Sequence, residues 1–121
     1  MLRGEEVITT LKAGGLFKHF GGSAPPVRVD ERLLSIVRVR CPSVPRTYLH
    51  LFVEHDYDTL APVRYSKPFY FRELGIEHCL SARQFGSFVH IFFSCWDTES
   101  WVCTVPAAVV LDSLDCDTCL L

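Results

Sequence analysis

The chain of 121 residues contains six cysteines and five histidines, the side chains best suited to metal binding or nucleophilic catalysis. Cys116 and Cys119 are separated by two residues, a spacing that lets both thiolates reach one zinc ion. A structural zinc site needs two more ligands, and the adjacent pair His78 and Cys79 would point apart on a strand or helix. The sequence therefore predicts no metal and no other cofactor. Cys116 and Cys119 are the candidate ligands for the alternative of a small zinc-binding protein.

Catalysis by a cysteine would need a histidine beside the thiol and a third group that orients the histidine. Cys95 lies in an apolar stretch, and an odd number of positions separates it from His90. The two side chains would therefore leave opposite faces of a strand. The chain also lacks the G-x-S-x-G and HExxH motifs and a glycine-rich phosphate loop. These features favour a non-enzymatic protein and leave an enzyme as the less favoured interpretation.

The expected strands at 33–41 and 47–55 would bring arginine and aromatic residues together. Alternation places two arginines on the side of the first strand that we expect to face solvent, and a third arginine follows in the next loop. Two aromatic residues would lie beside them on the second strand. Arginine and aromatic side chains are enriched where protein partners bind. The sequence therefore predicts a contact face formed by Arg38, Arg40, Arg46, Tyr48 and Phe52.

The same face has an alternative interpretation as an RNA-binding sheet. Arginines could contact phosphates while the aromatic rings stack on bases. The formal net charge of the chain is −2, however, whereas nucleic-acid-binding domains are usually basic. Protein interaction is therefore the first hypothesis and RNA binding the second.

The elements that would carry these residues follow from periodicity and from the positions of glycine and proline. A helix is expected at 4–13 and a second at 76–85, where Gly86 would end it. Alternating or continuous apolar patterns predict strands at 33–41, 47–55, 63–71, 87–96 and 101–105, the last two joined by a turn at 97–100. A short final helix is expected at 106–114, with Pro106 in its first turn.

These elements predict an α+β class with a single domain over residues 1–121. The sheet would be mainly antiparallel, with about five strands and two or three helices in the order α-β-β-β-α-β-β-α. Residues 21–26 are expected to form a turn or linker, and residues 115–121 an exposed tail. The strand at 87–96 is apolar on both sides, which predicts a central strand covered on both faces.

The composition predicts a contact with another protein. Hydrophobic residues make up 49% of the chain, which includes nine Phe, four Tyr and two Trp. A domain of this size buries only about two-thirds of the surface that its unfolded chain exposes. Some large side chains are therefore expected on a contact face for a protein partner or in a homo-oligomer, such as a homodimer. We accordingly predict an adaptor or regulatory module.

The start of the chain and its uncharged runs bear on location. Glu5 and Glu6 stand where a secretory signal would have its apolar core, so we expect an intracellular protein, in the cytoplasm or nucleus, with reduced cysteines. The longest uncharged runs, 84–96 and 100–111, are shorter than the ~20 residues of a spanning helix, so no membrane contact is expected. A viral accessory protein would fit so small a chain.

Overall fold

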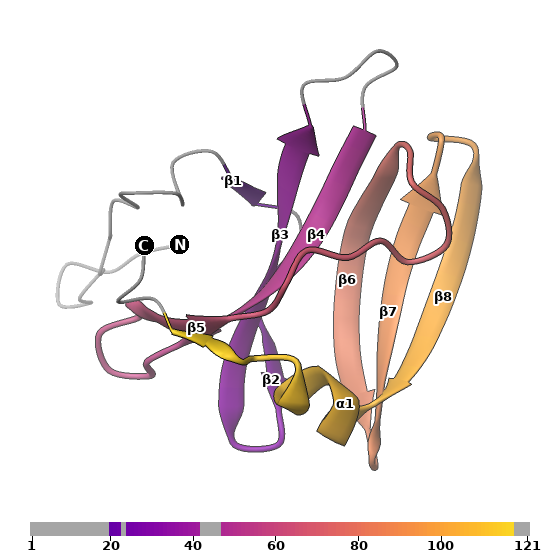
Figure 1. Cartoon of the computed structure of the whole chain (residues 1–121). Helices are drawn as coiled ribbons and strands as arrows, with labels where there is room; N and C mark the ends of the chain where they lie inside the picture. The colour runs from indigo at the N-terminus through magenta and orange to yellow at the C-terminus, as the bar shows by residue number, and fades with distance from the viewer. Residues whose placement is uncertain (1–19, 23, 42–46, 118–121) are drawn as a thin grey trace, which may run out of the picture.

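The computed structural model describes residues 20–22, 24–41 and 47–117, which form two antiparallel β-sheets and one short helix (Figure 1). The first sheet contains six strands and the second contains three. In chain order the strands are β1 (Phe20–Gly22), β2 (Val27–Val29), β3 (Arg32–Cys41), β4 (Thr47–His55), β5 (Pro62–Tyr65), β6 (Glu77–Phe85), β7 (Phe88–Cys95), β8 (Glu99–Pro106) and β9 (Cys116–Asp117). The helix α1 (Ala107–Asp112) lies between β8 and β9.

The predicted α+β class with about five strands and two or three helices is wrong. The described residues form nine strands and a single helix of six residues, so the fold is mostly β. The difference arises mainly at 76–85, which was expected to be a helix and forms strand β6. The predicted helix at 4–13 lies outside the described residues.

Segment 76–85 is a strand because it forms a hairpin with the strand that follows it. Phe85 pairs with Phe88 across a two-residue turn, and Gly86 adopts the positive φ of 58° that such a turn requires. A Gly-Ser pair between two apolar runs predicts a hairpin as well as a helix end. Gly86 therefore marks the turn of a hairpin and not the end of a helix.

The first sheet has the strand order β1-β3-β4-β5-β9, and β2 pairs with the first part of β3. Its centre is the antiparallel pair β3 and β4, in which Ile36 lies opposite Phe52. The predicted strands at 33–41 and 47–55 are thereby confirmed. The predicted strand at 63–71 is too long, because β5 ends at Tyr65.

The second sheet has the order β6-β7-β8 and is formed by consecutive segments of the chain. The predicted strands at 87–96 and 101–105 are confirmed as β7 and β8 with small shifts at their ends, and α1 confirms the helix predicted at 106–114. The turn between β7 and β8 comes earlier than expected, since Trp96 and Asp97 have positive φ angles of 55° and 58°. Both residues therefore occupy the left-handed region that favours glycine.

The connection from β5 to β6 links the two sheets (Figure 1). Its backbone pairs with the edge of β4, where the N–H of His50 donates to the Phe69 carbonyl at 2.8 Å and the N–H of Tyr48 donates to the Gly75 carbonyl at 2.9 Å. The same connection reaches the second sheet, because the ring of Phe71 stacks on that of Phe93 with centroids 4.7 Å apart. This segment therefore ties β4 to β7.

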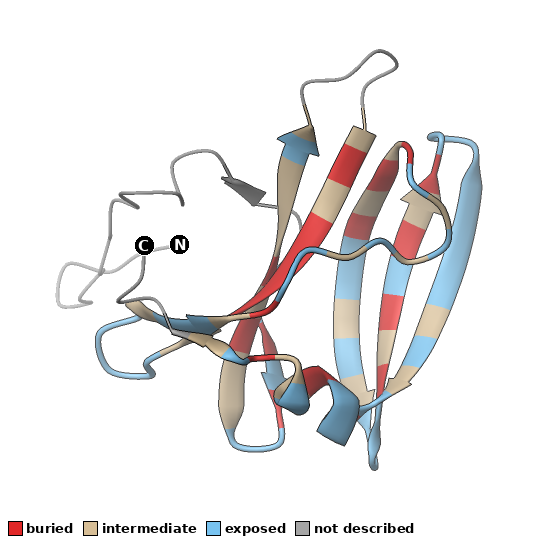
Figure 2. Ribbon diagram, in the orientation of Figure 1, coloured by how far each residue is buried: buried red, intermediate tan, exposed pale blue. Residues whose placement is uncertain are grey.

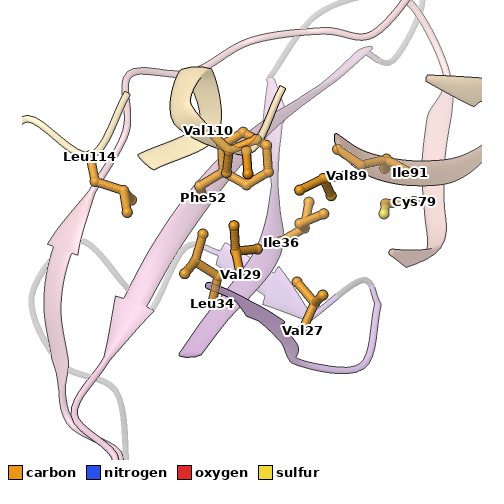
Figure 3. Close-up of a cluster of buried hydrophobic side chains, with 11 residues drawn as sticks. Val27, Val29, Leu34, Ile36, Phe52, Cys79, Val89, Ile91, Val110 and Leu114 are labelled. Atoms are coloured by element: carbon orange, nitrogen blue, oxygen red, sulfur yellow. The ribbon is translucent and has the colours of Figure 1, made fainter. Parts of the chain in front are cut away.

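The hydrophobic core lies between the two sheets and is closed at one end by α1 (Figure 3). Alternate residues of β7 point into it, and Val89, Ile91 and Phe93 are almost fully buried (Figure 2). Strands β2, β3, β4 and β6 and the helix contribute further apolar side chains, among them Val29, Leu34, Ile36, Phe52, Cys79 and Val110. Non-local contacts between the sheets therefore hold the described residues together.

The predicted linker and tail are partly in strands. Gly21 and Gly22 of the expected 21–26 linker lie in β1, which pairs with β3. In the expected tail at 115–121, Cys116 and Asp117 form β9 and pair with Tyr65 and Arg64 of β5. In the part of the chain that the structure describes, no helix has the length and apolar character needed to span a membrane.

Candidate functional site

The predicted arginine–aromatic face is only partly at the surface. Arg38 lies opposite His50 and Arg40 lies opposite Tyr48, so the expected sharing of one face is confirmed. Tyr48 and Phe52, however, are each only 8% exposed. The expectation that this face is solvent-exposed is wrong, because the second sheet and the β5–β6 connection pack against it. Arg46 lies outside the described residues.

The two described arginines of this set have different surroundings. Arg38 is half-buried and donates from Nη1 to Nδ1 of His78 at 3.0 Å, with its guanidinium 5.3 Å from the centroid of the Tyr48 ring. Arg40 has an exposed side chain. Stacking on RNA bases requires exposed rings, and the rings of Tyr48 and Phe52 are buried. This geometry does not favour the RNA-binding interpretation.

A fully buried carboxylate lies where β6 begins. Glu77 has no exposed area, and its carboxylate accepts hydrogen bonds from three successive backbone N–H groups. The donors are Phe71 at 2.8 Å, Arg72 at 2.9 Å and Glu73 at 3.1 Å. Successive N–H groups form a concave site that suits an anion. The carboxylate of Glu77 thus fixes the end of the β5–β6 connection.

A histidine and a cysteine accompany this carboxylate inside the protein. His50 is fully buried, and its Nε2 lies 3.6 Å from Oε1 of Glu77. Burial lowers the pKa of His50 to about 4, although the nearby carboxylate opposes the shift. The thiol of Cys95 donates to Oε2 of Glu77 at 3.6 Å, and burial together with the Glu77 charge raises its pKa. At neutral pH the cluster therefore holds a neutral imidazole and a protonated thiol.

This buried cluster has the residue types of a catalytic site without its geometry. A nucleophilic cysteine needs a thiolate and access to a substrate. The Cys95 side chain is 1% exposed, and its thiol donates to a carboxylate instead of to an imidazole. The helix predicted at 76–85 hides the cluster, because a helix would not place Glu77 opposite Cys95. The one signal of the cluster is an acidic residue at an inward position of the alternating pattern in β6.

The side of the second sheet that points away from the core carries several large, exposed apolar side chains. Phe92 of β7 lies opposite Val102 of β8, and Phe88 lies opposite Phe85 of β6, so these side chains share that side. Their exposed fractions run from 43% to 52%. We call this side the outer apolar face, and define it by Leu80, Phe85, Phe88, Phe92 and Val102.

The expectation that β7 is covered on both faces is therefore wrong. Its inward residues are buried, whereas Phe88 and Phe92 are 46% and 43% exposed. The apolar run of β7 thus serves the core on one side and the surface on the other. A continuous apolar run does not by itself show whether its second face meets the same chain or another molecule.

Polar side chains form a row across the middle of this side of the second sheet, with Arg83 and Thr104 on either side of His90. The guanidinium of Arg83 lies 5.0 Å from the centroid of the Phe85 ring. The ring of His90 lies 5.2 Å from that of Phe85, and its Nδ1 lies 3.2 Å from the hydroxyl of Thr104. Aromatic and arginine side chains with few charges are typical of the centre of a protein interface.

Both tryptophans of the chain lie at one end of the same sheet, and we call this group the tryptophan corner. Trp96 is 44% exposed, and its indole N–H donates to Oε1 of Glu73 at 2.7 Å. Trp101 is 39% exposed, with the guanidinium of Arg72 4.2 Å from its ring centroid. Cation–π contacts and exposed tryptophans are common where partners bind.

Metal binding finds no support in the described geometry. Among residues 20–22, 24–41 and 47–117, no three His, Cys, Asp or Glu side chains are grouped closely enough to hold an ion. The thiol of Cys116 donates to Oδ1 of Asp115 at 3.5 Å. Cys119, the second candidate ligand, lies outside the described residues.

Comparison with known proteins gives no relative from which a role could be transferred. No protein-family model, curated protein or solved structure matches the chain. Function must therefore be inferred from the surfaces and the buried groups described above.

Proposed function

We propose that this chain is a non-enzymatic protein-interaction module of the adaptor or regulatory kind. It binds a protein partner through the outer apolar face of the β6-β7-β8 sheet. The observation that carries the proposal is the exposure of Phe88 and Phe92 on the central strand of that sheet, with apolar neighbours on both flanking strands. Large apolar side chains that are exposed together on one side of a sheet mark a candidate interaction site.

The energetic reason is the cost of leaving these rings in water. Full burial of a phenylalanine side chain is worth about 1.5–3 kcal/mol, and Phe85, Phe88 and Phe92 each retain roughly half of their area. A partner that covers the face recovers this free energy. The tryptophan corner adds the residue types that dominate binding energy at protein interfaces.

The buried titratable groups also favour a binding role over a catalytic one. The thiol of Cys95 and the imidazole of His50 are enclosed, and both hold the uncharged form at neutral pH. Of the contact residues predicted from the sequence, Arg40 keeps an exposed side chain, whereas Tyr48 and Phe52 contribute to the interior. The proposed contact surface therefore lies on the second sheet.

Substitution of Phe92 tests the proposal. We expect Phe92→Thr to weaken capture of the protein partner by at least about tenfold, because truncating a central aromatic residue costs more than ~1.4 kcal/mol. Threonine suits an exposed strand position, so the fold is expected to persist. Affinity capture with the purified full chain, followed by titration of the captured protein, measures the change.

Tyr57 provides the matched control. It is 50% exposed but lies in the turn between β4 and β5, away from the second sheet. Tyr57→Thr should leave the titrated affinity unchanged. Equal affinity of the wild type and both variants, with unchanged thermal unfolding, would remove the outer apolar face as the contact surface.

A further inference from the structure

Strand β8 ends the second sheet on one side. It pairs with β7 over all eight residues from Glu99 to Pro106, with no shift in register. No described strand pairs with its other edge. An edge strand presents a row of unpaired backbone N–H and C=O groups to its surroundings, which makes it a template for another strand.

The remaining edges of the described sheets are protected, and β8 is not. Strand β6 has a bulge after Cys79, and its Gln84 side chain bonds to the backbone N–H and the carboxylate of Asp30 at 2.6 and 2.8 Å. The strands β1, β2 and β9 are only two or three residues long. Bulges, cover and short length are the devices that prevent edge pairing.

Strand β8 lacks these devices along its whole length. Its sequence, ESWVCTVP, has no charged residue after Glu99. Trp101 and Val102 are 39% and 51% exposed. An edge of eight residues with no bulge and a single charged side chain, at Glu99, is open to pairing with a strand from another molecule.

We infer that β8 pairs in antiparallel fashion with β8 of a second copy of this chain. The two copies would form one continuous sheet of six strands, three from each copy. A twofold axis perpendicular to the sheet relates them, so side chains of the same face meet across the junction. The inference deepens the proposed function, because it names one protein partner and gives it the sheet edge, whereas the outer apolar face remains for another.

The register follows from the faces and from Pro106. Residues opposite one another must share a face, and Pro106 has no N–H to donate to a neighbouring strand. A register in which Pro106 is unpaired places Val102 opposite Val102 of the second copy, at the twofold axis. Ser100 then lies opposite Thr104, and Glu99 lies opposite Val105.

The charges of the strand fit a second copy. In this register the only charged side chain of β8, Glu99, has an apolar residue across from it, so no like charges meet. The hydroxyl groups of Ser100 and Thr104 face each other, as in favourable cross-strand pairs. The outer apolar faces of the two copies also become continuous, because both lie on the same side of the joined sheet.

Charge substitutions at the twofold axis test the inference. The full chain should sediment with twice the monomer mass of 13.8 kDa. We expect Val102→Lys and Val102→Glu to raise the dimer dissociation constant at least tenfold, because each places like charges directly opposite one another. An equimolar mixture of the two variants should recover the dimer as a one-to-one heterodimer. Sedimentation equilibrium and native mass spectrometry measure both effects.

Tyr57→Lys is the matched control, since Tyr57 is 50% exposed in the turn between β4 and β5, outside both the β8 edge and the outer apolar face. It should leave the dimer intact, as should Phe92→Thr. A monomeric wild-type chain at all concentrations would overturn the inference, including the case in which residues 1–19 of the same chain cover the edge. Failure of the mixed variants to associate would also overturn it.

The two proposals fail in different ways. If Phe92→Thr dissociates the dimer as Val102→Lys does, the copies meet through the outer apolar face, to which both residues belong, and the edge inference is wrong. If Val102→Lys dissociates the dimer while Phe92→Thr leaves the affinity for other proteins unchanged, the edge inference stands and the proposed contact face is wrong.

Discussion

Glu77 shows how backbone hydrogen bonds can hold a buried carboxylate that has no charged partner beside it. Its carboxylate receives three backbone N–H groups, and the nearest basic side chain, His50, stays neutral because burial lowers its pKa to about 4. Hydrogen bonds to a carboxylate are among the stronger ones in proteins. Hydrogen bonds to the single carboxylate of Glu77 therefore position the β5–β6 connection.

The low pKa of His50 predicts a loss of stability in mild acid. In the unfolded chain His50 titrates near 6.5, so between pH 6.5 and about 4 the unfolded state binds more protons than the folded state. The free energy of unfolding should therefore fall as the pH drops through this window, by on the order of 3 kcal/mol in total for His50. Urea unfolding at a series of pH values measures the slope.

A variant without the imidazole separates His50 from other titrating groups. His50→Leu removes the group, and its apolar side chain suits the neighbouring rings of Phe69 and Phe71. Its free energy of unfolding should depend less on pH between 6.5 and 4 than that of the wild type. Parallel slopes for the two proteins would show that the acid sensitivity arises elsewhere.

At the scale of elements, the β7–β8 turn is held by the β5–β6 connection. Trp96 has a positive φ of 55°, a conformation that costs a bulky residue of order 1–3 kcal/mol. The indole N–H bonds to Glu73, and the backbone N–H of Trp96 donates to the Ile76 carbonyl at 2.7 Å. The indole ring also lies directly on Gly75, so contacts outside the turn offset its strain.

Gly75→Ala should disturb this contact. A Cβ at residue 75 would come within 2.7 Å of Cζ2 of Trp96, so the indole ring must move away from its present position. We expect the free energy of unfolding to fall by about 1–3 kcal/mol, the usual cost of overpacking. Chemical denaturation monitored by tryptophan fluorescence measures this change.

A double-mutant cycle identifies the cause of the Gly75 effect. In a Trp96→Leu background the indole ring is absent, so Gly75→Ala should cost much less there than in the wild type. An equal cost in both backgrounds would mean that the strain at residue 75 comes from the backbone and not from the ring.

The strands with clear alternation could be predicted from the sequence. Strand β6, and with it the separate second sheet, could not. Segment 47–55 has the period of a strand and forms β4 over the same residues. Segment 76–85 allows both periods over short stretches, and only the pairing of Phe85 with Phe88 decides for a strand. Pairing between segments is a tertiary property, which local periodicity does not contain.

The candidate site was misplaced for a related reason. Alternation correctly placed Arg38 and Arg40 on one side of β3, but it cannot tell which side another sheet will cover. The second sheet was absent from the prediction, so the buried rings of Tyr48 and Phe52 were expected at the surface. The exposed rings of Phe88 and Phe92 were expected to be covered, because the run at 87–96 is apolar on both faces.

At the scale of the whole molecule, one core unites two sheets formed from different parts of the chain. Ile91 of the second sheet is 1% exposed and belongs to the same apolar cluster as Leu34 and Ile36 of the first. Shared burial of this kind makes the two sheets unfold together. Unfolding of the described residues should therefore be a single cooperative transition.

Ile91→Ala tests this dependence. Removing the buried side chain should lower the free energy of unfolding by about 2–5 kcal/mol while far- and near-ultraviolet circular dichroism keep a common midpoint. Val109→Ala, at a position on α1 that is 55% exposed, should change the free energy by less than about 0.5 kcal/mol. Separate midpoints for the two signals would show that the sheets unfold independently.

The pairing of β9 with β5 has a consequence for synthesis on the ribosome. The hairpins β6-β7 and β7-β8 join neighbouring stretches of chain, so they can close soon after each segment emerges. Strand β5 must instead wait for Cys116 and Asp117, which are translated after the entire second sheet. The nascent polypeptide therefore completes its first sheet only after the whole second sheet has been translated.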